Sequence, residues 1–375
     1  MKIVFTGGGT GGHIFPILAI CREMKKIYTK PDLKLYYLGP EDKYGLDLLS
    51  QEGIIVKKIL TGKLRRYFSL KNFLDFFKMP IGFLQAFFWL FFLAPDLIFS
   101  KGGYGSFPIA LAGNILSIPI FLHESDIRPG LASKIESKWA LEIFISFHET
   151  EIFPKDKRVL VGNPIRKEIL GGRKEEAKKM FNLKGDKPVI LITGGSQGSE
   201  KINEIVLEIL PELLKDFEII HQTGENNFKR IKAESEALLS DETLKKYYHP
   251  FPFLKESDLK GSLAVSDLVV ARAGSGSIFE IAACGKPAIL IPLSHSAQNH
   301  QLKNAYAFSE SGGGEVMEEK NLTPHFFLEK IKYLFERIDI LEKMARNSQE
   351  FAQPRAAKII ASYIIEYLKA TIKKS

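Results

Sequence analysis

The sequence is poor in cysteine. Its 375 residues include two, Cys21 and Cys284, which lie far apart in segments predicted to be helical. Small secreted proteins rely on a framework of disulfides, and two distant cysteines do not indicate one. A reducing compartment is therefore expected. Residues 1–6 run directly into glycines without an extended apolar region, so no secretory signal peptide is predicted.

Metal-binding patterns and membrane-spanning runs are also lacking. The chain has no Asp-x-Asp pair and no cluster of histidines and cysteines, so a metal-dependent diphosphate site is not supported. We predict neither a metal nor another cofactor. The apolar run at residues 81–93 is too short to cross a bilayer.

The residues that are present describe a globular protein with an acidic partner. The composition is 45% hydrophobic and 26% charged, and the length suffices for two domains, each with its own core. The formal net charge of +8 indicates attraction to phosphates, anionic lipid or nucleic acid.

Three buried-strand patterns each run into a glycine-rich turn that precedes a helix. These turns lie at residues 6–13, 101–105 and 194–198. The glycines at positions 7, 9 and 12 satisfy the dinucleotide-binding fingerprint, which alone is a weak signal. A tight loop between strand and helix explains any one turn equally well, but three in one chain favour phosphate binding.

Short apolar strands alternate with helical patterns along the chain. This alternation predicts an α/β protein with two doubly wound Rossmann-like domains facing across a cleft. We place the domains at residues 1–165 and 166–375, with the last helix, residues 356–367, able to pack back on the N-terminal domain. The strands are predicted at residues 2–5, 33–38, 54–60, 96–100, 119–122, 141–147, 189–193, 217–221, 250–254, 267–271 and 288–293.

The segment from residue 267 to residue 305 has the pattern of a nucleotide half-site. A buried strand leads into the small-residue turn 272–277, whose free amides suit an anion, and Glu280 follows within the first turn of the next helix. An acidic side chain in that place can accept hydrogen bonds from ribose hydroxyls. A second strand then precedes a polar run that includes Gln301 and Asn304, whose amides suit the hydroxyls of a sugar.

Titratable side chains follow the strands of the first half. His13 lies at the amino end of the first helix, where the helix dipole disfavours its protonated form, as a neutral general base requires. An ordinary capping histidine is an equally good interpretation of His13. His123 and Glu124 end another strand and should line the same crevice as the glycine turns. Arg166, at the domain junction, suits a diphosphate, or else a surface ion pair with Glu168 or Glu175.

Residues 61–94 combine basic and aromatic side chains. Arg65 and Arg66 precede an apolar run that includes Phe87 and Trp89, and Pro80 interrupts its start. A core helix would explain the pattern, but a surface helix of an α/β domain needs only one apolar stripe. We therefore favour contact with an anionic membrane surface, where aromatic rings enter the acyl boundary and cations meet the headgroups.

Taken together, these motifs resemble, in order and spacing, the bacterial peptidoglycan glycosyltransferases that form lipid II. The resemblance covers nearly the whole chain and implies a GT-B fold. It also implies an inverting transfer of N-acetylglucosamine from UDP-N-acetylglucosamine to the 4-hydroxyl of undecaprenyl-diphospho-N-acetylmuramyl-pentapeptide (lipid I). The motifs that carry it are residues 8–13, 102–105, 123–124, 162–166, 194–198 and 272–280.

The resemblance also implies a setting. It places the enzyme peripherally on the cytoplasmic face of the inner membrane, in peptidoglycan synthesis and hence in cell shape and cell division. Its expected partners are UDP-N-acetylglucosamine, lipid I and the anionic membrane surface, without nucleic acid, and cell-wall or division proteins are left open.

The resemblance assigns roles to individual residues. His13 is the candidate base, supported by Glu124 and Tyr104, and Asp126 stands where the family usually has an asparagine, so that it cannot donate an amide hydrogen bond. The other implied substrate-binding residues are Thr10, Gly11 and Gly12 on the acceptor side, and Arg166, Ser196, Phe253 (through its backbone), Gly274, Ser275, Glu280, Gln301 and Asn304 on the donor side.

Three alternatives remain open at this point. An NAD-dependent oxidoreductase would use the glycines at positions 7, 9 and 12 but leaves Glu280 unexplained. A non-catalytic module for nucleic acid or membranes would explain the positive charge and predicts salt-sensitive binding without turnover. Another GT-B transferase that uses a UDP-sugar and a soluble acceptor is the third, against which the aromatic segment around Trp89 argues.

Overall fold

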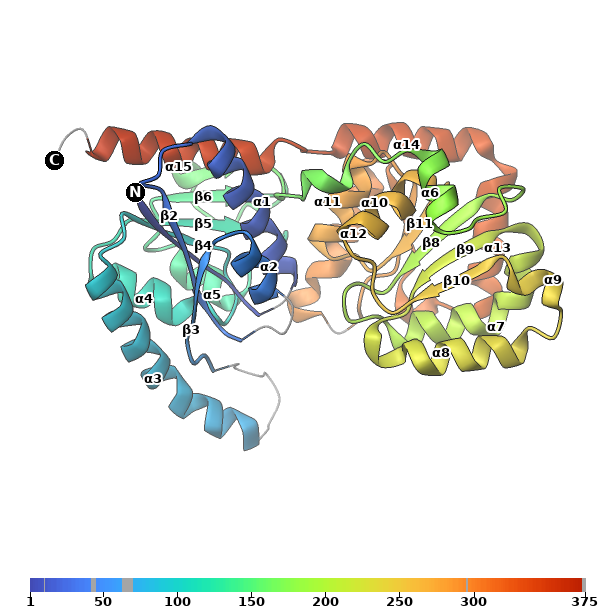
Figure 1. Cartoon of the computed structure of the whole chain (residues 1–375), viewed down its shortest axis with the longest axis horizontal. Coiled ribbons are helices and arrows are strands. Elements are labelled where there is room, and N and C mark those ends of the chain that lie inside the picture. Colours follow the sequence, from blue (N-terminus) through green and yellow to red (C-terminus); the bar gives the residue numbers. More distant parts are fainter. Residues whose placement is uncertain (10, 42–44, 63–69, 295, 373–375) are drawn as a thin grey trace. The chain divides into compact units, whose positions relative to one another are not determined.

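The computed structural model describes residues 1–9, 11–41, 45–62, 70–294 and 296–372. The chain divides into two compact units. The first unit comprises Met1–Arg166 together with Gln353–Ser375, and the second comprises Lys167–Ala352. Each unit is built around one sheet of parallel strands (Figure 1).

The sheet of the first unit has the strand order β3-β2-β1-β4-β5-β6-β7 among the described residues. The order reverses between β1 and β4, which places the ends of these neighbouring strands at the point where such sheets bind ligands. Thr6, at the end of β1, pairs in register with Ser100, at the end of β4. The strands are β1 (Lys2–Thr6), β2 (Lys34–Gly39), β3 (Ile55–Lys58), β4 (Leu97–Ser100), β5 (Ile120–Glu124), β6 (Glu142–Ile145) and β7 (Arg158–Leu160).

Helices cover both faces of this sheet because successive strand side chains point to opposite sides. Ile3 and Phe5 of β1 pack with α1 and α15, whereas Val4 packs in a second core with α3 and α4. The last helix thus lies beside the first (Figure 1). The helices are α1 (Gly11–Ile27), α2 (Gly45–Gln51), α3 (Leu70–Leu93), α4 (Phe107–Ile115), α5 (Leu131–Glu136), the 3₁₀ turn η1 (Lys155–Lys157) and α15 (Ala356–Ile372).

The sheet of the second unit has the order β10-β9-β8-β11-β12-β13. Its reversal between β8 and β11 repeats that of the first sheet, so its ligand edge lies at the ends of these two strands. The strands are β8 (Val189–Thr193), β9 (Glu218–Gln222), β10 (Tyr248–Phe251), β11 (Leu268–Ala271), β12 (Ala288–Leu290) and β13 (Gly314–Val316).

Two apolar cores flank this second sheet. Ile190 and Val270 face one core, and Leu191 and Val269 face the other, as the alternation along buried strands requires. The helices are η2 (Lys167–Ile169), α6 (Lys174–Met180), α7 (Glu200–Asp216), α8 (Glu225–Leu238), α9 (Glu242–Lys245), α10 (Glu256–Val265), α11 (Ser275–Ala283), η3 (Ala297–Asn299), α12 (His300–Glu310), η4 (Glu319–Asn321), α13 (Pro324–Glu336) and α14 (Ile338–Phe351).

The predicted fold class, two doubly wound α/β domains, is confirmed, but three elements differ. The strand predicted at residues 250–254 is β10, which starts earlier and accommodates Pro250 because β10 is an edge strand. Pro80 does not interrupt the apolar run, since α3 continues through it. The edge strand β13 was not predicted, because its three residues Gly-Glu-Val show no apolar run.

Candidate functional site

The imidazole of His13 lies between the two glycine turns of the first unit. A Cβ atom added to Gly8 would stand 2.9 Å from Cε1 of this ring, and one added to Gly103 would stand 2.9 Å from its Nε2. Gly103 also has a φ of +87°, which side chains disfavour. The hydroxyl of Tyr104 lies against Gly9 in the same way. These turns therefore need glycine in order to seat His13.

The environment of His13 keeps its ring neutral. Burial and the charge of Lys101 lower the pKa of His13 to about 3. The neutral form matches the sequence-based prediction, but the causes are burial and a neighbouring cation.

Lys101 is a buried cation that the sequence analysis did not single out. Its side chain is 4% exposed, and burial lowers its pKa to about 8 although Glu124 and Asp126 oppose this shift. Its ammonium group donates to the hydroxyl of Ser125. The available signal was a lysine placed between a buried strand and a glycine turn, where its stem cannot reach solvent easily.

Glu124 is a buried carboxyl at the end of β5. The backbone N–H of Asp126 donates to its Oε1 at 3.0 Å. Burial, followed by the charge of Asp126, raises the pKa of Glu124, while hydrogen bonds, including one from Ser133, and the charge of Lys101 oppose the rise. A carboxyl with these surroundings is better matched to accepting a proton near neutral pH than an ordinary one.

Residues 162–166 tie this cluster together. Nε2 of His123 lies 3.1 Å from the carbonyl oxygen of Gly162, and the Ser125 hydroxyl donates to Oδ1 of Asn163 at 3.2 Å. The guanidinium of Arg166 lies 4.0 Å from the centre of the Phe15 ring, and its side chain is buried. Arg166 is therefore a buried residue of the first unit.

The third glycine turn opens α7 in the second unit. Gly195 and Gly198 have φ values of +85° and +77°. Ser196, at the top of the turn, is exposed, whereas Ser199 caps the helix by accepting from the N–H of Ile202. The Ser196 hydroxyl can donate to an anion, whereas the amides of Gly195 and Gly198 already donate to Thr193 Oγ1 and to the Gly195 carbonyl oxygen.

Arg272 connects this turn with the turn that precedes α11. Its Nη2 lies 2.6 Å from Ser199 Oγ and 2.5 Å from Glu319 Oε1, and its Nη1 donates to the carbonyl oxygen of Ile291 at 3.2 Å. Glu319 also accepts from the backbone and hydroxyl of Ser294. The charge of Arg272 is thus paired inside the unit, where its guanidinium contacts Ser199, Ile291 and Glu319.

The turn at Gly274 leads into α11, whose first residue is Ser275. The Ser275 hydroxyl is buried and has no hydrogen-bond partner among the described residues. Glu280 is half-buried and is the sixth residue of α11. It therefore lies in the second turn of the helix, and the prediction that it lies in the first turn is wrong. The strand β11 ends at Ala271 and α11 begins at Ser275, so residues 275–277, which were predicted to belong to the turn, form the first turn of the helix.

The polar run after β12 contains strained backbone. Gln298 and Asn299 both have left-handed conformations, with φ values of 57° and 55°. Gln301 accepts the N–H of Leu293 through Oε1 at 3.0 Å, and Asn304 is fully buried. Phe253, half-buried, lies in the loop after β10, where the N–H of Leu254 donates to Gln222.

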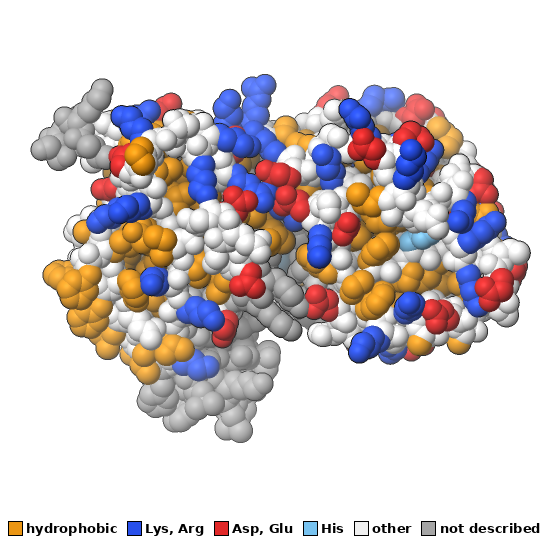
Figure 2. Space-filling model, in the orientation of Figure 1, with side chains coloured by type: hydrophobic (Ala, Val, Ile, Leu, Met, Phe, Trp, Pro, Cys, Tyr) orange, Lys and Arg blue, Asp and Glu red, His pale blue; other side chains and the backbone are white. Residues whose placement is uncertain are grey.

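The helix α3 has one buried and one exposed apolar face. Ala86 and Leu90 are buried, and Phe87 packs partly against the same core. Figure 2 shows hydrophobic side chains gathered over the carboxyl-terminal half of α3. The exposed side chains are Ile81, Leu84, Phe88, Trp89, Phe91 and Phe92, with Phe92 78% exposed. Lys57 of β3 lies 4.6 Å from the centre of the Trp89 ring, so a cation borders this face.

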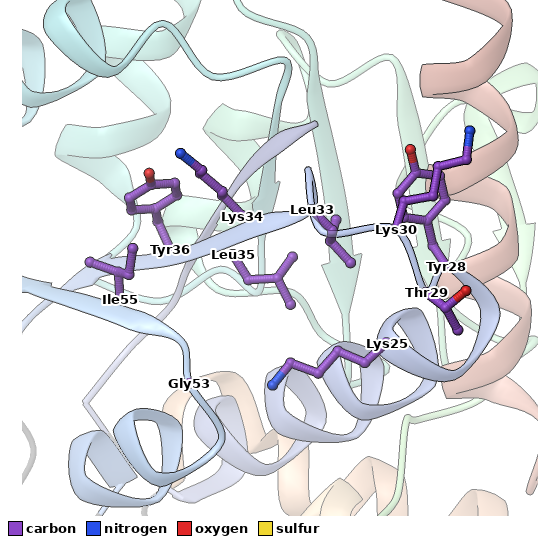
Figure 3. A pocket seen from close by; sticks show the side chains of 10 residues that line it. All are labelled: Lys25, Tyr28, Thr29, Lys30, Leu33, Lys34, Leu35, Tyr36, Gly53 and Ile55. Carbon is purple, nitrogen blue, oxygen red and sulfur yellow. The ribbon is translucent and has the colours of Figure 1, made fainter.

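A pocket of about 440 Å³ lies elsewhere in the first unit (Figure 3). Lys25, Lys34 and Tyr36 are among the residues that line it, and Gly53 forms part of its edge. It lies at the beginning of β2 and β3, whereas the glycine turns follow the ends of β1 and β4. Because parallel sheets bind ligands at the carboxyl ends of their strands, this pocket is not the candidate site.

Some predictions fall outside the described residues or concern absences. Thr10, Arg65 and Arg66 lie outside the described ranges. Within those ranges no group of three His, Cys, Asp or Glu side chains could hold a metal ion. Across the same part of the chain, no helix has the length and apolar character needed to span a membrane.

Models of the two domains of one family match this chain. The glycosyltransferase family 28 N-terminal domain matches residues 3–145, and the glycosyltransferase family 28 C-terminal domain matches residues 189–360. Together with the two parallel sheets, these matches define the class as a glycosyltransferase of family 28.

Similar proteins narrow this class. The UDP-N-acetylglucosamine--N-acetylmuramyl-(pentapeptide) pyrophosphoryl-undecaprenol N-acetylglucosamine transferase of Clostridium tetani is 38% identical over 92% of this chain and 93% of its own. The protein of the same name from Treponema denticola is 35% identical, over 96% of both chains. The crystal structure of Acinetobacter baumannii MurG has a TM-score of 0.72 and 25% identity, covering 97% of this chain and 99% of that one. The chain belongs to this family of N-acetylglucosamine transferases, and the resemblance inferred from its motifs is confirmed.

Proposed function

We propose that the protein transfers N-acetylglucosamine from UDP-N-acetylglucosamine to the 4-hydroxyl of the muramyl sugar of lipid I, forming lipid II and UDP. The observation that carries this proposal is the identity of 35% to 38% with enzymes of that name over more than nine tenths of the chain. Both units also present glycine turns at the switch points of their sheets, where such folds bind ligands.

The second unit would bind the donor. The amides at Gly274 and Ser275 and the amino end of α11 suit the diphosphate, because a helix amino terminus attracts anions. The buried Ser275 hydroxyl, which lacks a partner among the described residues, supports this assignment, since such a group normally has one. Ser196 in the third turn would donate to the same phosphates. Arg166 is a further proposed diphosphate-binding residue, because a guanidinium can pair with phosphate oxygens in a bidentate manner.

The ribose and the N-acetylglucosamine of the donor would bind to residues that follow the turn at Gly274 in the sequence. Glu280 would accept from the ribose hydroxyls, and the backbone at Phe253 would face uracil. Gln301 keeps its amide N–H groups for the N-acetylglucosamine hydroxyls, because its Oε1 already accepts from Leu293. The left-handed residues 298–299 support a binding role for this loop, since strained backbone gathers at such sites. Asn304 would orient the loop from its buried position.

The first unit would bind the acceptor and take its proton. His13 and Glu124 are the two candidate bases, with the turn at Gly11 and Gly12, Tyr104 and Asp126 around them. A pKa of about 3 makes His13 a weak proton acceptor. Burial and the charge of Asp126 raise the pKa of Glu124, which makes its carboxylate a stronger base than an ordinary one. We therefore assign the proton to Glu124 and a hydrogen bond with the acceptor hydroxyl to neutral His13.

The negative charge that develops in the transfer lies on UDP. Backbone amides aimed at the diphosphate would stabilise it without reorganisation, as oxyanion holes do. Removing the proton of the acceptor hydroxyl would add general-base help of about 10²- to 10⁴-fold.

The exposed apolar face of α3 would hold the enzyme on the cytoplasmic face of the inner membrane, where lipid I is expected. Each aromatic side chain contributes about 1.5–3 kcal/mol when fully buried in an apolar phase. Trp89, bordered by Lys57, has the amphipathic character of an interfacial anchor. Phe87, half-buried, would fix this face to the sheet.

The experiment that tests the proposal supplies the purified protein with UDP-N-acetylglucosamine and a lipid I analogue in detergent. Mass spectrometry of the products should show the disaccharide lipid, and UDP should be released in equal amount. A matched reaction with NADH in place of the UDP-sugar serves as the control for the dehydrogenase alternative. Release of UDP without disaccharide, or no reaction with a lipid-linked acceptor, would contradict the proposal.

A further inference from the structure

A buried carboxyl on α5 forms hydrogen bonds with side chains at both ends of the second glycine turn. Glu136 is the last residue of α5 and is 0% exposed. Its Oε2 lies 2.5 Å from Oγ of Ser100, and its Oε1 lies 2.6 Å from Oγ of Ser106. Ser100 ends β4 and Ser106 directly precedes α4, so one side chain spans the turn between them.

The same two hydroxyls hold the backbone of the turn. The N–H of Gly102 donates to Ser100 Oγ at 3.0 Å, and Ser106 Oγ lies 2.9 Å from the carbonyl oxygen of Gly103. The hydroxyl of Ser106 therefore points back into the turn and does not cap α4.

The number of hydrogens in this cluster determines the charge of Glu136. Four contacts join Glu136, the two serines, Gly102 and Gly103, but the serine hydroxyls and the Gly102 amide supply three hydrogens. Ser106 cannot donate its single hydrogen to both Gly103 and Glu136. A proton on Oε1 of Glu136 supplies the fourth hydrogen, which Ser106 accepts, and every contact is then a hydrogen bond.

We propose that Glu136 is a positioning residue whose neutral, protonated carboxyl holds the second glycine turn in the shape that seats His13. Gly103 provides the link, because a Cβ there would touch both the His13 ring and the backbone of Gly8. When Glu136 ionises, the Ser106 hydroxyl can donate its single hydrogen either to the carboxylate or to the Gly103 carbonyl oxygen, but not to both. One of these two hydrogen bonds is then lost, and the turn becomes less rigid. We call the hydrogen bonds by which Glu136 holds Ser100 and Ser106 the clamp. The predicted effect on turnover rests on the proposed function, whereas the clamp itself does not.

The charged surroundings of Glu136 agree with a protonated carboxyl. Burial, and to a smaller extent the charge of Glu124 on β5, raises the pKa of Glu136 to about 7, although hydrogen bonds that the serine hydroxyls donate to the ionised carboxylate oppose this rise. The other ionisable groups on the elements around it are His123 on β5, Lys101 and Tyr104 in the turn and Lys134 on α5. Neither β4 nor α4 contains an ionisable side chain.

The sign of the pH dependence follows from this raised pKa. Between the ordinary carboxyl pKa of 4.5 and about 7, the folded protein holds a proton that the unfolded chain has lost. The free energy of unfolding therefore decreases as pH rises through this window. Turnover should decrease as pH rises through about 7, because the ionised carboxylate no longer holds the turn.

Two substitutions test the clamp. Glu136→Gln places a carbonyl oxygen near Ser100 and an N–H donor near Ser106, as the protonated acid does, but cannot ionise. Glu136→Ala removes both contacts. We expect Glu136→Gln to keep wild-type turnover at pH 6.5 and to lose the decline at higher pH. Glu136→Ala should lower kcat about 10-fold or more while leaving the KM for UDP-N-acetylglucosamine unchanged, since a misplaced site costs orders of magnitude.

The measurements are kcat and both KM values from pH 6 to pH 9, and urea unfolding from pH 4.5 to pH 8 without substrate. The unfolding series should show a steeper dependence on pH in wild type than in Glu136→Gln. Equal pH dependence of unfolding in these two proteins, or a Glu136→Gln turnover as low as that of Glu136→Ala, would overturn the clamp. If wild type fails to transfer sugar to lipid I but the unfolding series differ, the proposed function fails and the clamp stands.

Discussion

The glycine turns of the two units are surrounded by different chemistry. In the first unit, five ionisable side chains with shifted pKa values lie at the turns or next to them, namely His13, Lys101, His123, Glu124 and Glu136. In the second unit, the turns present backbone amides and the hydroxyls of Ser196 and Ser275. The charged pair there, Arg272 and Glu319, is joined at 2.5 Å.

This difference indicates a division of labour. Perturbed pKa values gather where protons are transferred or withheld, which suits the unit that would activate the acceptor hydroxyl. Preorganised amides at a helix amino terminus bind an anion without any change of protonation, which suits the unit that would hold UDP. Four predictions test whether the two units have these different functions.

Glu124→Gln should have the largest effect. Loss of the proposed base should lower kcat about 10²- to 10⁴-fold while donor affinity stays unchanged. Because the pKa of Glu124 is raised, wild-type kcat should fall on acidification at a higher pH than an ordinary carboxyl would give, and the variant should lack this fall. In the same steady-state assays, the kcat of His13→Ala should decrease less than that of Glu124→Gln. A greater loss in His13→Ala would return the role of base to His13.

Glu280→Ala should weaken the donor and spare the chemical step. A hydrogen bond to a charged group contributes about 1.5–3 kcal/mol, so the Kd for UDP-N-acetylglucosamine should rise about 10- to 100-fold. Isothermal titration with the donor measures this change, and Glu315→Ala, on the edge strand β13, is the matched control. Unchanged affinity in Glu280→Ala would remove this carboxylate from the ribose.

Phe92→Ser should reduce membrane binding without affecting either binding site. Transfer of this exposed ring out of the acyl boundary should lower the partition coefficient on phosphatidylglycerol vesicles about 10-fold. Phe326→Ser in α13 of the second unit is the control, since Phe326 is also exposed, at 48%. Sedimentation with vesicles measures both variants, and an equal loss in the two would show that α3 is not a specific membrane face.

Ser275→Ala should have the smallest effect. A hydrogen bond between neutral groups contributes about 0.5–1.5 kcal/mol, which corresponds to roughly a 2- to 10-fold weaker Kd for UDP. Since the Ser275 hydroxyl has no partner in the described part of the unliganded chain, thermal stability should stay constant. A drop in Tm with unaltered UDP affinity would mean that this hydroxyl serves the fold.

The glycine turns and the strands that precede them could be predicted because their signals are local. A buried apolar run followed by glycines specifies a strand and a close turn within about ten residues. The roles of Lys101 and Glu136 could not be predicted in this way. Glu136 is a single charged residue in a short helix, and only the packing of α5 against β4 and β5 buries it beside Ser100 and Ser106. Lys101 lies in a glycine turn that the sequence does reveal, but the sequence does not show that the charges of Glu124 and Asp126 act on its ammonium group.

The same limit applies to Arg272 and α3. The sequence shows Arg272 beside a glycine turn, as a phosphate-binding arginine would be, but not that Glu319, 47 residues later, neutralises it. Pro80 marks an expected interruption, yet α3 continues through it. Contacts between residues far apart in the sequence depend on tertiary packing, which local patterns do not encode. The same packing can offset the free-energy cost of a proline inside a helix.

The most direct test of the division between the units is a single-turnover measurement of sugar transfer to a lipid I analogue at saturating UDP-N-acetylglucosamine. We expect the rate of Glu124→Gln to remain far below that of wild type, because no concentration of donor replaces the base. The rate of Glu280→Ala should approach that of wild type, because saturation restores the bound donor. A Glu280→Ala rate that stays as low as that of Glu124→Gln would contradict the account.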